Sequence, residues 1–281
     1  MSQPPVVAII AQGEMGAGIG ARLTQSGVTV LTVLQGRSEA SAARAAQAGM
    51  QPVADADLAQ ADLILSILPP SGAMDLAQRL APVLRHAREK PAYADCNAVS
   101  PDTARQIAAV IEAAGAPFID AGIIGTAPRP GYTPVIYASG ADAPRLAALN
   151  AFGLDIRAMD GPAGQASAMK MCYAGLTKGL HAIGLSVMLG AIEAGIAEPY
   201  FAELAESQPQ LLAYFTGRTP STFAKAYRWV AEMEEIGGFL GGAGRQIYDG
   251  AARQFERLAA DHAGERLDES ALLAFLRGPK S

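Results

Sequence analysis

Short apolar runs alternate with amphipathic segments along the first part of the chain. The apolar runs have strand length and are bounded by turn-forming residues, and they predict strands over 6–11, 28–34, 61–68, 92–95, 118–120, 134–138 and 154–157. Segments with helical spacing separate them, near 15–26, 38–49, 72–86, 101–115 and 142–152. This alternation is typical of βαβ units and predicts a doubly wound α/β domain with a parallel sheet.

The pattern changes after residue 162. The sequence Gly161-Pro162-Ala163-Gly164 interrupts it, and the apolar stretch 165–194 that follows contains no proline. Because proline is favourable near the start of a helix, this stretch is predicted to form one long, buried helix. Residues 198–281 have helical periodicity and no strand pattern. We therefore expect an α/β domain over 1–162 and an all-helical domain over 163–281, joined by a long interdomain helix.

Composition narrows the class of protein. Hydrophobic residues make up 50% and charged residues 17% of the 281 residues, which is enough for a substantial core and unlike a disordered chain. The formal net charge of −5 gives no basic footprint, so no nucleic-acid partner is expected. The cysteines and histidines have neither the number for a disulfide framework nor metal-ligand spacing, so no metal site is expected: Cys96, Cys172, His86, His181 and His262.

The first residues predict the compartment. Residues 1–5 carry no positive side chain, and the apolar run that follows is too short for a signal peptide or a membrane span. We therefore expect a soluble, cytoplasmic protein without a membrane partner.

A glycine cluster follows the first predicted strand. It reads Ala11-x-Gly13-x-x-Gly16, so alanine stands at the first position of the G-x-G-x-x-G pattern. A strand, a tight turn and a helix N-terminus together form an anion site, because backbone N–H groups and the helix dipole point at a phosphate. A plain turn is the alternative, but the position between a strand and a helix favours a Rossmann dinucleotide-binding loop. Its expected cofactor contacts are Gly13, Glu14, Met15 and Gly16.

The end of the second predicted strand selects the cofactor. NAD-binding sites generally place a carboxylate there for the ribose 2′-hydroxyl, whereas arginine suits the 2′-phosphate of NADP. The sequence has Arg37 and Ser38 and no acid at this place. A solvated arginine and a simple helix N-cap are the alternative interpretation. NADP is the expected cofactor, with NAD as the alternative.

A further loop follows the strand predicted over 61–68. Leu68, Pro69 and Pro70 come at its carboxyl end, and strand carboxyl ends face the ligand crevice in such sheets. We expect this loop to cover the adenosine-ribose side of the cofactor. The alternative is a turn without a ligand.

These segments resemble one enzyme family. The chain is similar to the β-hydroxyacid dehydrogenases, which include 3-hydroxyisobutyrate dehydrogenase and 6-phosphogluconate dehydrogenase. The helical part, with Ala226-Tyr-Arg-Trp229 and Glu232-Met-Glu-Glu235, is most similar to 6-phosphogluconate-dehydrogenase-like members. The segments that carry the resemblance are 13–16, 68–70, 95–101, 118–125 and 161–170.

The resemblance implies a catalytic lysine early in the interdomain helix. Lys170 is the matching residue, and a lysine beside a carbinol relays a proton while hydride transfers. A lysine that snorkels from a packed helix is the alternative. The family commonly has asparagine four residues later, where this chain has Ala174. Tyr173 is on the same side and is a candidate for that polar role, or a core residue. Lys178 is interpreted as an ordinary surface lysine.

The resemblance also locates the substrate segment. The family has a Ser-Gly-Gly ending after the strand that begins at Phe118, whereas this chain reads Ile123-Ile124-Gly125-Thr126. Ile124 replaces the serine, so the pocket is expected to be more apolar, with Gly125 amides and the Thr126 hydroxyl as the polar contacts. Asn97 follows the strand at 92–95, where the nicotinamide ribose is expected. Capping of the next helix is the alternative for Asn97 and Ser100.

The sequence therefore predicts an NADP-preferring oxidoreductase that transfers hydride between nicotinamide and a small hydroxyacid-like carbinol or carbonyl, with Lys170 as general acid/base. A homodimer is expected, as the resemblance implies, because one small domain cannot easily cover the apolar helix. The alternatives are an imine reductase on the same scaffold, which Lys170 disfavours, and a non-catalytic NADP-binding protein.

Overall fold

The computed structural model describes residues 4–278. The chain divides into two compact units, and the division falls between Met171 and Cys172. This point lies inside helix α6 (Gln165–Glu193), whereas the sequence places the boundary in the preceding loop, after residue 162.

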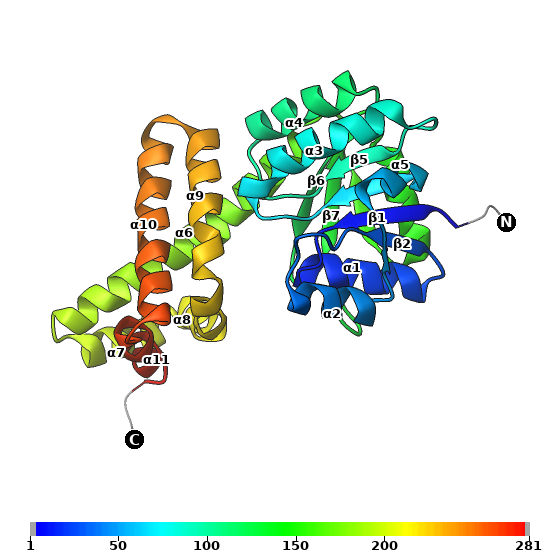
Figure 1. Cartoon of the computed structure of the whole chain (residues 1–281). Helices are drawn as coiled ribbons and strands as arrows, with labels where there is room; N and C mark the ends of the chain where they lie inside the picture. The colour runs from blue at the N-terminus through cyan, green and yellow to red at the C-terminus, as the bar shows by residue number, and fades with distance from the viewer. Residues whose placement is uncertain (1–3, 279–281) are drawn as a thin grey trace. The chain divides into compact units, whose positions relative to one another are not determined.

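An eight-stranded sheet forms the centre of the first unit (Figure 1). Its order is β3-β2-β1-β4-β5-β6-β7-β8, and every neighbouring pair is parallel except β6 and β7. The order reverses direction at β1, between β2 and β4, which is the switch point where such sheets open a ligand crevice. The strands are β1 Val6–Ile10, β2 Thr29–Thr32, β3 Gln51–Pro52, β4 Leu63–Ser66, β5 Ala92–Asp95, β6 Phe118–Ile124, β7 Val135–Ser139 and β8 Asp155–Ala158.

Helices cover both faces of this sheet, because side chains alternate between faces along each strand. Helices α1 and α2 lie on one face, and α3 and α4 on the other (Figure 1). Val7 and Ile9 of β1 belong to the core on the first face, and Ala8 and Ile10 to the core on the second. The helices are α1 Glu14–Gln25, α2 Glu39–Gln47, α3 Ala73–His86, α4 Pro101–Ala113 and α5 Ala143–Ala147, with 3₁₀ turns η1 Asp55–Gln60, η2 Pro70–Gly72 and η3 Ala148–Phe152.

The predicted α/β fold is confirmed, with local differences. Strand β6 continues to Ile124 instead of ending at residue 120, and β7 returns antiparallel to it. A parallel return needs a crossover helix, and the connection from 125 to 134 contains none. The helix expected over 142–152 is divided into α5 and η3. Strand β3 has only two residues, too few to give a pattern.

The second unit is helical within the described residues. Helices α9 and α10 lie side by side and antiparallel (Figure 1). The turn between them has positive φ at Gly241 (+62°) and at Gly242 (+48°), the first residue of α10. Small residues of α6 admit rings from neighbouring helices: a Cβ at Gly175 would lie 2.9 Å from the Tyr248 hydroxyl, and one at Gly184 would lie 2.1 Å from the Phe215 ring. Besides α6, the helices are α7 Ala197–Ser207, α8 Pro209–Arg218, α9 Ala226–Leu240, α10 Gly242–Ala263 and α11 Leu267–Leu276, with η4 Thr219–Ser221 and η5 Phe223–Lys225.

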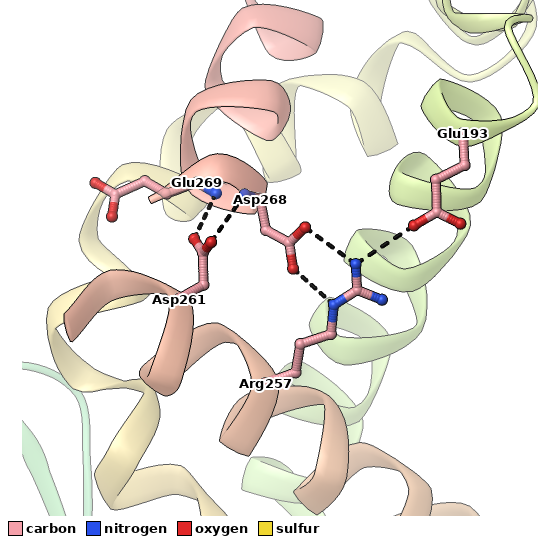
Figure 2. A network of polar contacts seen from close by, with 5 residues as sticks. All are labelled: Glu193, Arg257, Asp261, Asp268 and Glu269. Carbon is pink, nitrogen blue, oxygen red and sulfur yellow. Dashed lines mark hydrogen bonds and ion pairs between the residues drawn. The ribbon is translucent and has the colours of Figure 1, made fainter. Parts of the chain in front are cut away.

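A polar network fastens the last helix to this unit (Figure 2). Arg257 of α10 donates to Asp268 at 2.6 and 3.0 Å, and also to Glu193 at the end of α6 at 3.4 Å. Asp261 accepts the backbone N–H groups of Asp268 and Glu269 at 3.0 and 2.9 Å. A carboxylate at this helix N-terminus satisfies unpaired amides and opposes the helix dipole, so α11 is held in register.

Lys178 is not the surface lysine that the sequence suggests. It forms an ion pair with the buried Glu232, and its ammonium lies 5.1 Å from the centre of the Trp229 ring. The sequence around Lys178 does not predict this ion pair, because its partner Glu232 is far away in the chain.

His181 lies in the same helical unit and is only 2% exposed. Its Nε2 lies 2.8 Å from the Thr222 hydroxyl, and the rings of Phe215, Tyr214 and Trp229 surround it. Burial, with a smaller contribution from the positive charge of Arg218, lowers the pKa of His181 to about 4.

This pKa predicts a loss of stability in acid. Between pH 6.5 and 4 an unfolded histidine binds a proton that native His181 does not bind, so the free energy of unfolding falls as the pH falls. Stability is complete above pH 6.5, and the loss reaches roughly 3 kcal/mol near pH 4. Denaturant unfolding followed by fluorescence of the single tryptophan, Trp229, measures this change in the helical unit.

The His181→Phe variant keeps an aromatic ring and cannot titrate, so its stability should depend less on pH over the same range. His86→Gln removes an exposed histidine of α3 and is the control. An equal pH dependence in wild type and His181→Phe would contradict the assignment.

Candidate functional site

The turn between β1 and α1 brings backbone against backbone. A Cβ on Gly16 would lie 1.9 Å from the Ala11 carbonyl oxygen, so only glycine allows this approach. Nothing lies within 4 Å of the corresponding position on Gly13. Alanine at position 11 is compatible with the turn, because the close approach is made by Gly16.

The N-terminus of α1 is built to receive an anion. Gly13 is the N-cap residue and makes no side-chain capping hydrogen bond, so the amides of the first turn are not satisfied by a cap. Glu14 and Met15 form the first turn together with Gly16, where Glu14 is exposed and Met15 packs partly on the core. Open space at Gly13, uncapped amides and a helix dipole fit the pyrophosphate of a dinucleotide.

An arginine and a serine follow β2 in the loop that leads to α2. Arg37 is exposed, and its Nε lies 3.3 Å from the side-chain oxygen of Gln12. Ser38 is the N-cap of α2 and accepts the Ser41 N–H at 3.3 Å. Partial burial, followed by the positive charge of Arg79, lowers the pKa of the Arg37 guanidinium. The positive charge of Arg37 therefore lies beside the glycine turn.

Asn97 connects the loops after β4 and β5. Its side-chain oxygen accepts the Leu68 N–H at 2.5 Å, and its side-chain nitrogen donates to Ser66 at 2.8 Å. The residue is 1% exposed. Both ends of the amide are therefore engaged by protein, and its observed role is to order the loop of Leu68, Pro69 and Pro70. Ser100 caps α4 by accepting the Thr103 N–H at 3.3 Å.

Asp120, buried in β6, accepts hydrogen bonds from the start of α6, and we call this set of contacts the Asp120 clasp. One carboxylate oxygen accepts the N–H groups of Gly164 and Ser167 at 2.8 and 3.0 Å and the Ser139 hydroxyl at 2.9 Å. The other oxygen accepts the Ser167 hydroxyl at 2.6 Å. Ser139 of β7 in turn accepts the Ala166 N–H at 3.0 Å. The first turn of α6 is therefore fixed to two strands by charge-assisted hydrogen bonds.

The same contact places Lys170 beside the predicted substrate segment. A Cβ on Gly122 would lie 2.9 Å from both the Ala166 carbonyl oxygen and the Lys170 Cβ, so glycine lets α6 lie directly on β6. The Lys170 amine donates to the Ile123 carbonyl oxygen at 2.7 Å. The structure thus brings Lys170 and Ile123 together at the end of β6, next to Ile124.

A tight turn orders the rest of this segment. Gly125 has φ of +130°, and a Cβ there would lie 2.1 Å from the Tyr132 hydroxyl. That hydroxyl accepts the Thr126 N–H at 3.3 Å. Arg22 of α1 holds the carbonyls of Arg129 and Tyr132 at 3.1 and 3.3 Å. The segment is therefore anchored to the helix that begins at the cofactor turn.

The remaining candidates lie beyond the first unit. Tyr173 is exposed and Ala174 is buried, both in the second unit. No group of three or more histidine, cysteine, aspartate or glutamate residues suited to a metal occurs within 4–278.

Three residues that organise this site carry no role in the sequence interpretation. Gln12 is a buried polar residue inside the glycine turn, Arg44 contacts its backbone, and Asp120 is a charged residue in a buried strand. A polar residue at a position that should be apolar was the available signal for Gln12 and Asp120. Arg44 gave none, because arginine is ordinary on a helix.

Two family models match the chain. The NAD-binding domain of 6-phosphogluconate dehydrogenase matches residues 6–152. A domain of unknown function, DUF1932, matches residues 191–258 within the helical unit.

Individual proteins are also similar to this chain in sequence or in fold. The conserved protein MTH1747 of unknown function, whose structure was described as similar to 3-hydroxyacid dehydrogenases, is 30% identical, with a TM-score of 0.68 and coverage of 93% of this chain and 98% of that one. The "Uncharacterized 28.5 kDa protein in 7S RNA 5'region" of Methanothermus fervidus is 29% identical over 83% of this chain and 90% of its own length. Mycobacterium tuberculosis 3-hydroxyisobutyrate dehydrogenase, solved with L-serine, shares the fold at 21% identity, with a TM-score of 0.71 and coverage of 98% and 100%.

The matched model spans the turn at Gly13, the end of β2 and strand β6, and it ends before α6, which carries Lys170. The chain therefore belongs to the family defined by the NAD-binding domain of 6-phosphogluconate dehydrogenase.

Proposed function

We propose that this protein is an NADP-preferring oxidoreductase that acts on a small hydroxyacid-like carbinol or carbonyl substrate. The observation that carries the proposal is the Lys170 amine held on the Ile123 carbonyl at the end of β6. This strand ends at the same edge of the parallel sheet as the glycine turn and Arg37. One edge therefore combines an anion site, positive charge and a proton-carrying amine.

Lys170 has the chemistry required of the general acid/base. The nicotinamide supplies or accepts the hydride when the cofactor is bound. The carbinol oxygen must exchange a proton in the same reaction, and a lysine amine within hydrogen-bond reach performs that transfer. The Ile123 carbonyl orients the amine by one hydrogen bond, and the clasp at Asp120 fixes the helix that carries it. Ile123 and Ile124 make the neighbouring wall apolar and favour a small substrate.

Two alternatives remain distinguishable. An imine reductase on the same scaffold reduces C=N, and an ordered lysine at this place favours the carbonyl reaction. A non-catalytic NADP-binding protein would bind cofactor and turn over no substrate. A screen of hydroxyacids, aldehydes and imines that follows NADPH absorbance separates these classes.

The proposal includes a homodimer formed through α6. Residues 173, 176, 180, 183 and 187 follow one another at intervals of four and three and form an exposed apolar stripe, which includes Leu176 at 72% and Ile183 at 53% exposure. This spacing is the seam that one helix presents to another helix. A second copy offers the same stripe, and twofold pairing would bury both. Helix α6 is also long and apolar enough to cross a membrane by length and composition alone.

Cofactor preference is the first test. NADPH should bind at least about tenfold more tightly than NADH, because a charge-assisted contact to the 2′-phosphate contributes roughly 1.5–3 kcal/mol. Arg37→Ala should narrow the difference by weakening NADPH alone. Fluorescence titration with each nucleotide measures both affinities, and equal affinities in the wild type would exclude the preference.

The role of Lys170 is the second test. With a substrate from the screen, Lys170→Ala should lower kcat by about 10²–10⁴ and leave NADPH affinity nearly unchanged, because only the proton relay is lost. Lys170→Arg should not restore the rate, because a guanidinium does not release its proton at working pH.

Lys90→Ala is the matched control for this test. The Lys90 amine also holds backbone carbonyls, those of Leu84 at 2.7 Å and Arg85 at 2.8 Å, but Lys90 precedes β5 and is at the opposite edge of the sheet. Its loss should leave kcat close to the wild-type value. Near-normal turnover by Lys170→Ala would disprove the assignment.

Assembly is the third test. Light scattering at micromolar concentration should give about twice the 29.0 kDa chain mass, or a multiple of that value. Leu176→Glu combined with Ile183→Glu should produce monomers, because charges would be buried in the seam. Ile196→Glu, at a residue 51% exposed outside the stripe, should keep the wild-type mass. A wild-type monomer would refute the dimer. Partition of the protein into lipid vesicles would also refute it, because the stripe on α6 would then face lipid instead of a second copy.

A further inference from the structure

Gln12 is a fully buried polar residue in the middle of the cofactor turn. Its side-chain nitrogen donates to the Thr32 hydroxyl and, at 3.0 Å, to the Val33 carbonyl. The Thr32 hydroxyl donates onward to the Ile9 carbonyl at 2.7 Å. The amide therefore joins the ends of β1 and β2 and has one fixed orientation, which turns its oxygen toward the Arg37 Nε.

The backbone of Gln12 holds a second arginine. The Arg44 Nε donates to the Gln12 carbonyl oxygen at 2.8 Å, and an Arg44 Nη donates to the Ser41 hydroxyl at 3.2 Å. Arg44 is on α2, one turn after the serine pair that caps this helix. One residue of the glycine turn thus contacts the guanidinium groups of both Arg37 and Arg44.

Both arginines are without an acidic partner in the part of the chain from 4 to 278. Arg79, whose positive charge is felt at Arg37, pairs with Asp55 at 3.4 Å, whereas no carboxylate lies within ion-pair distance of Arg37 or Arg44. Unneutralised cations that are held in place by neutral acceptors favour an anion from solution. Two guanidinium forks and serine hydroxyls match the oxygens of a phosphate monoester.

We infer that Gln12 is a positioning residue for the 2′-phosphate of the cofactor, holding Arg37 by its side-chain oxygen and Arg44 by its backbone oxygen. Arg44 is then a second phosphate-binding arm beside Arg37 and Ser38. This inference rests on the proposed NADP preference. It adds that the preference depends on a residue whose own side chain does not contact the phosphate.

The test measures binding of NADPH and NADH to the full-length protein, without any substrate. Gln12→Met keeps the length and burial of the side chain and removes its polar atoms. It should weaken the binding of NADPH by about three- to tenfold and leave the binding of NADH unchanged, because only the hydrogen bond that orients the Arg37 guanidinium is lost. Arg44→Gln should weaken NADPH by about tenfold, again without an effect on NADH.

Matched controls separate these effects from general damage. Gln47→Met makes the same chemical change at an exposed position of α2, and Arg85→Gln removes an exposed arginine of α3. Neither should change either affinity. Isothermal titration with adenosine 2′,5′-bisphosphate and with 5′-AMP repeats the comparison on the adenosine half alone.

A double variant tests whether Gln12 acts through Arg37. In the Arg37→Ala background, Gln12→Met should cause no further loss of NADPH affinity, whereas a merely structural role would add its loss independently and would weaken NADH as well. If Gln12→Met does not fold, Gln12→Glu keeps the side-chain length, and its carboxylate should reduce NADPH affinity by pairing with Arg37 and repelling the phosphate.

The outcomes are distinguishable. A wild-type protein that prefers NADPH, with unchanged preference in Gln12→Met, Gln12→Glu and Arg44→Gln, overturns the inference and leaves the proposed function intact. A wild-type protein with no preference refutes the proposed cofactor choice and the inference with it.

Discussion

The geometry of the candidate site depends on one buried carboxylate. Asp120 accepts four hydrogen bonds from the start of α6 and from β7, and hydrogen bonds to charged groups contribute roughly 1.5–3 kcal/mol each. This clasp and the missing side chain at Gly122 let α6 lie against β6. This packing of α6 on β6 sets the distance from the Lys170 amine to the Ile123 carbonyl oxygen. A catalytic amine on a long helix needs such an anchor, because a small tilt at the helix start would move it away from a substrate.

Charge is arranged differently at the two parts of the site. Around Asp120 every polar atom of the carboxylate is engaged, which makes the clasp rigid. Arg37, in the loop after β2, and Arg44, on α2, are oriented by neutral groups of Gln12 and have no acidic partner among the described residues. A salt bridge there would neutralise the charge that a phosphate requires. The first arrangement suits a structural joint and the second suits a binding site.

Local sequence signals predicted the fold and part of the site. Short apolar runs of strand length, separated by segments with helical spacing, predicted the α/β sheet. The glycine spacing located the turn after β1, where Gly16 makes its close contact. The antiparallel return of β7 was not visible, because a strand pattern carries no direction. The roles of Asn97 and Lys178 depend on Leu68, Ser66 and Glu232, which lie far away in the sequence. Gln12 and Asp120 were visible only as polar residues at buried positions, and their partners come from the tertiary structure.

A crystal structure of the protein with NADP⁺ tests the central claim most directly. The account predicts the pyrophosphate at the amides of Gly13–Gly16, the 2′-phosphate between Arg37 and Arg44, and the nicotinamide ring on the side of the sheet edge where the Lys170 amine lies. A cofactor bound with its 2′-phosphate away from both arginines, or with its nicotinamide directed away from Lys170, would contradict it.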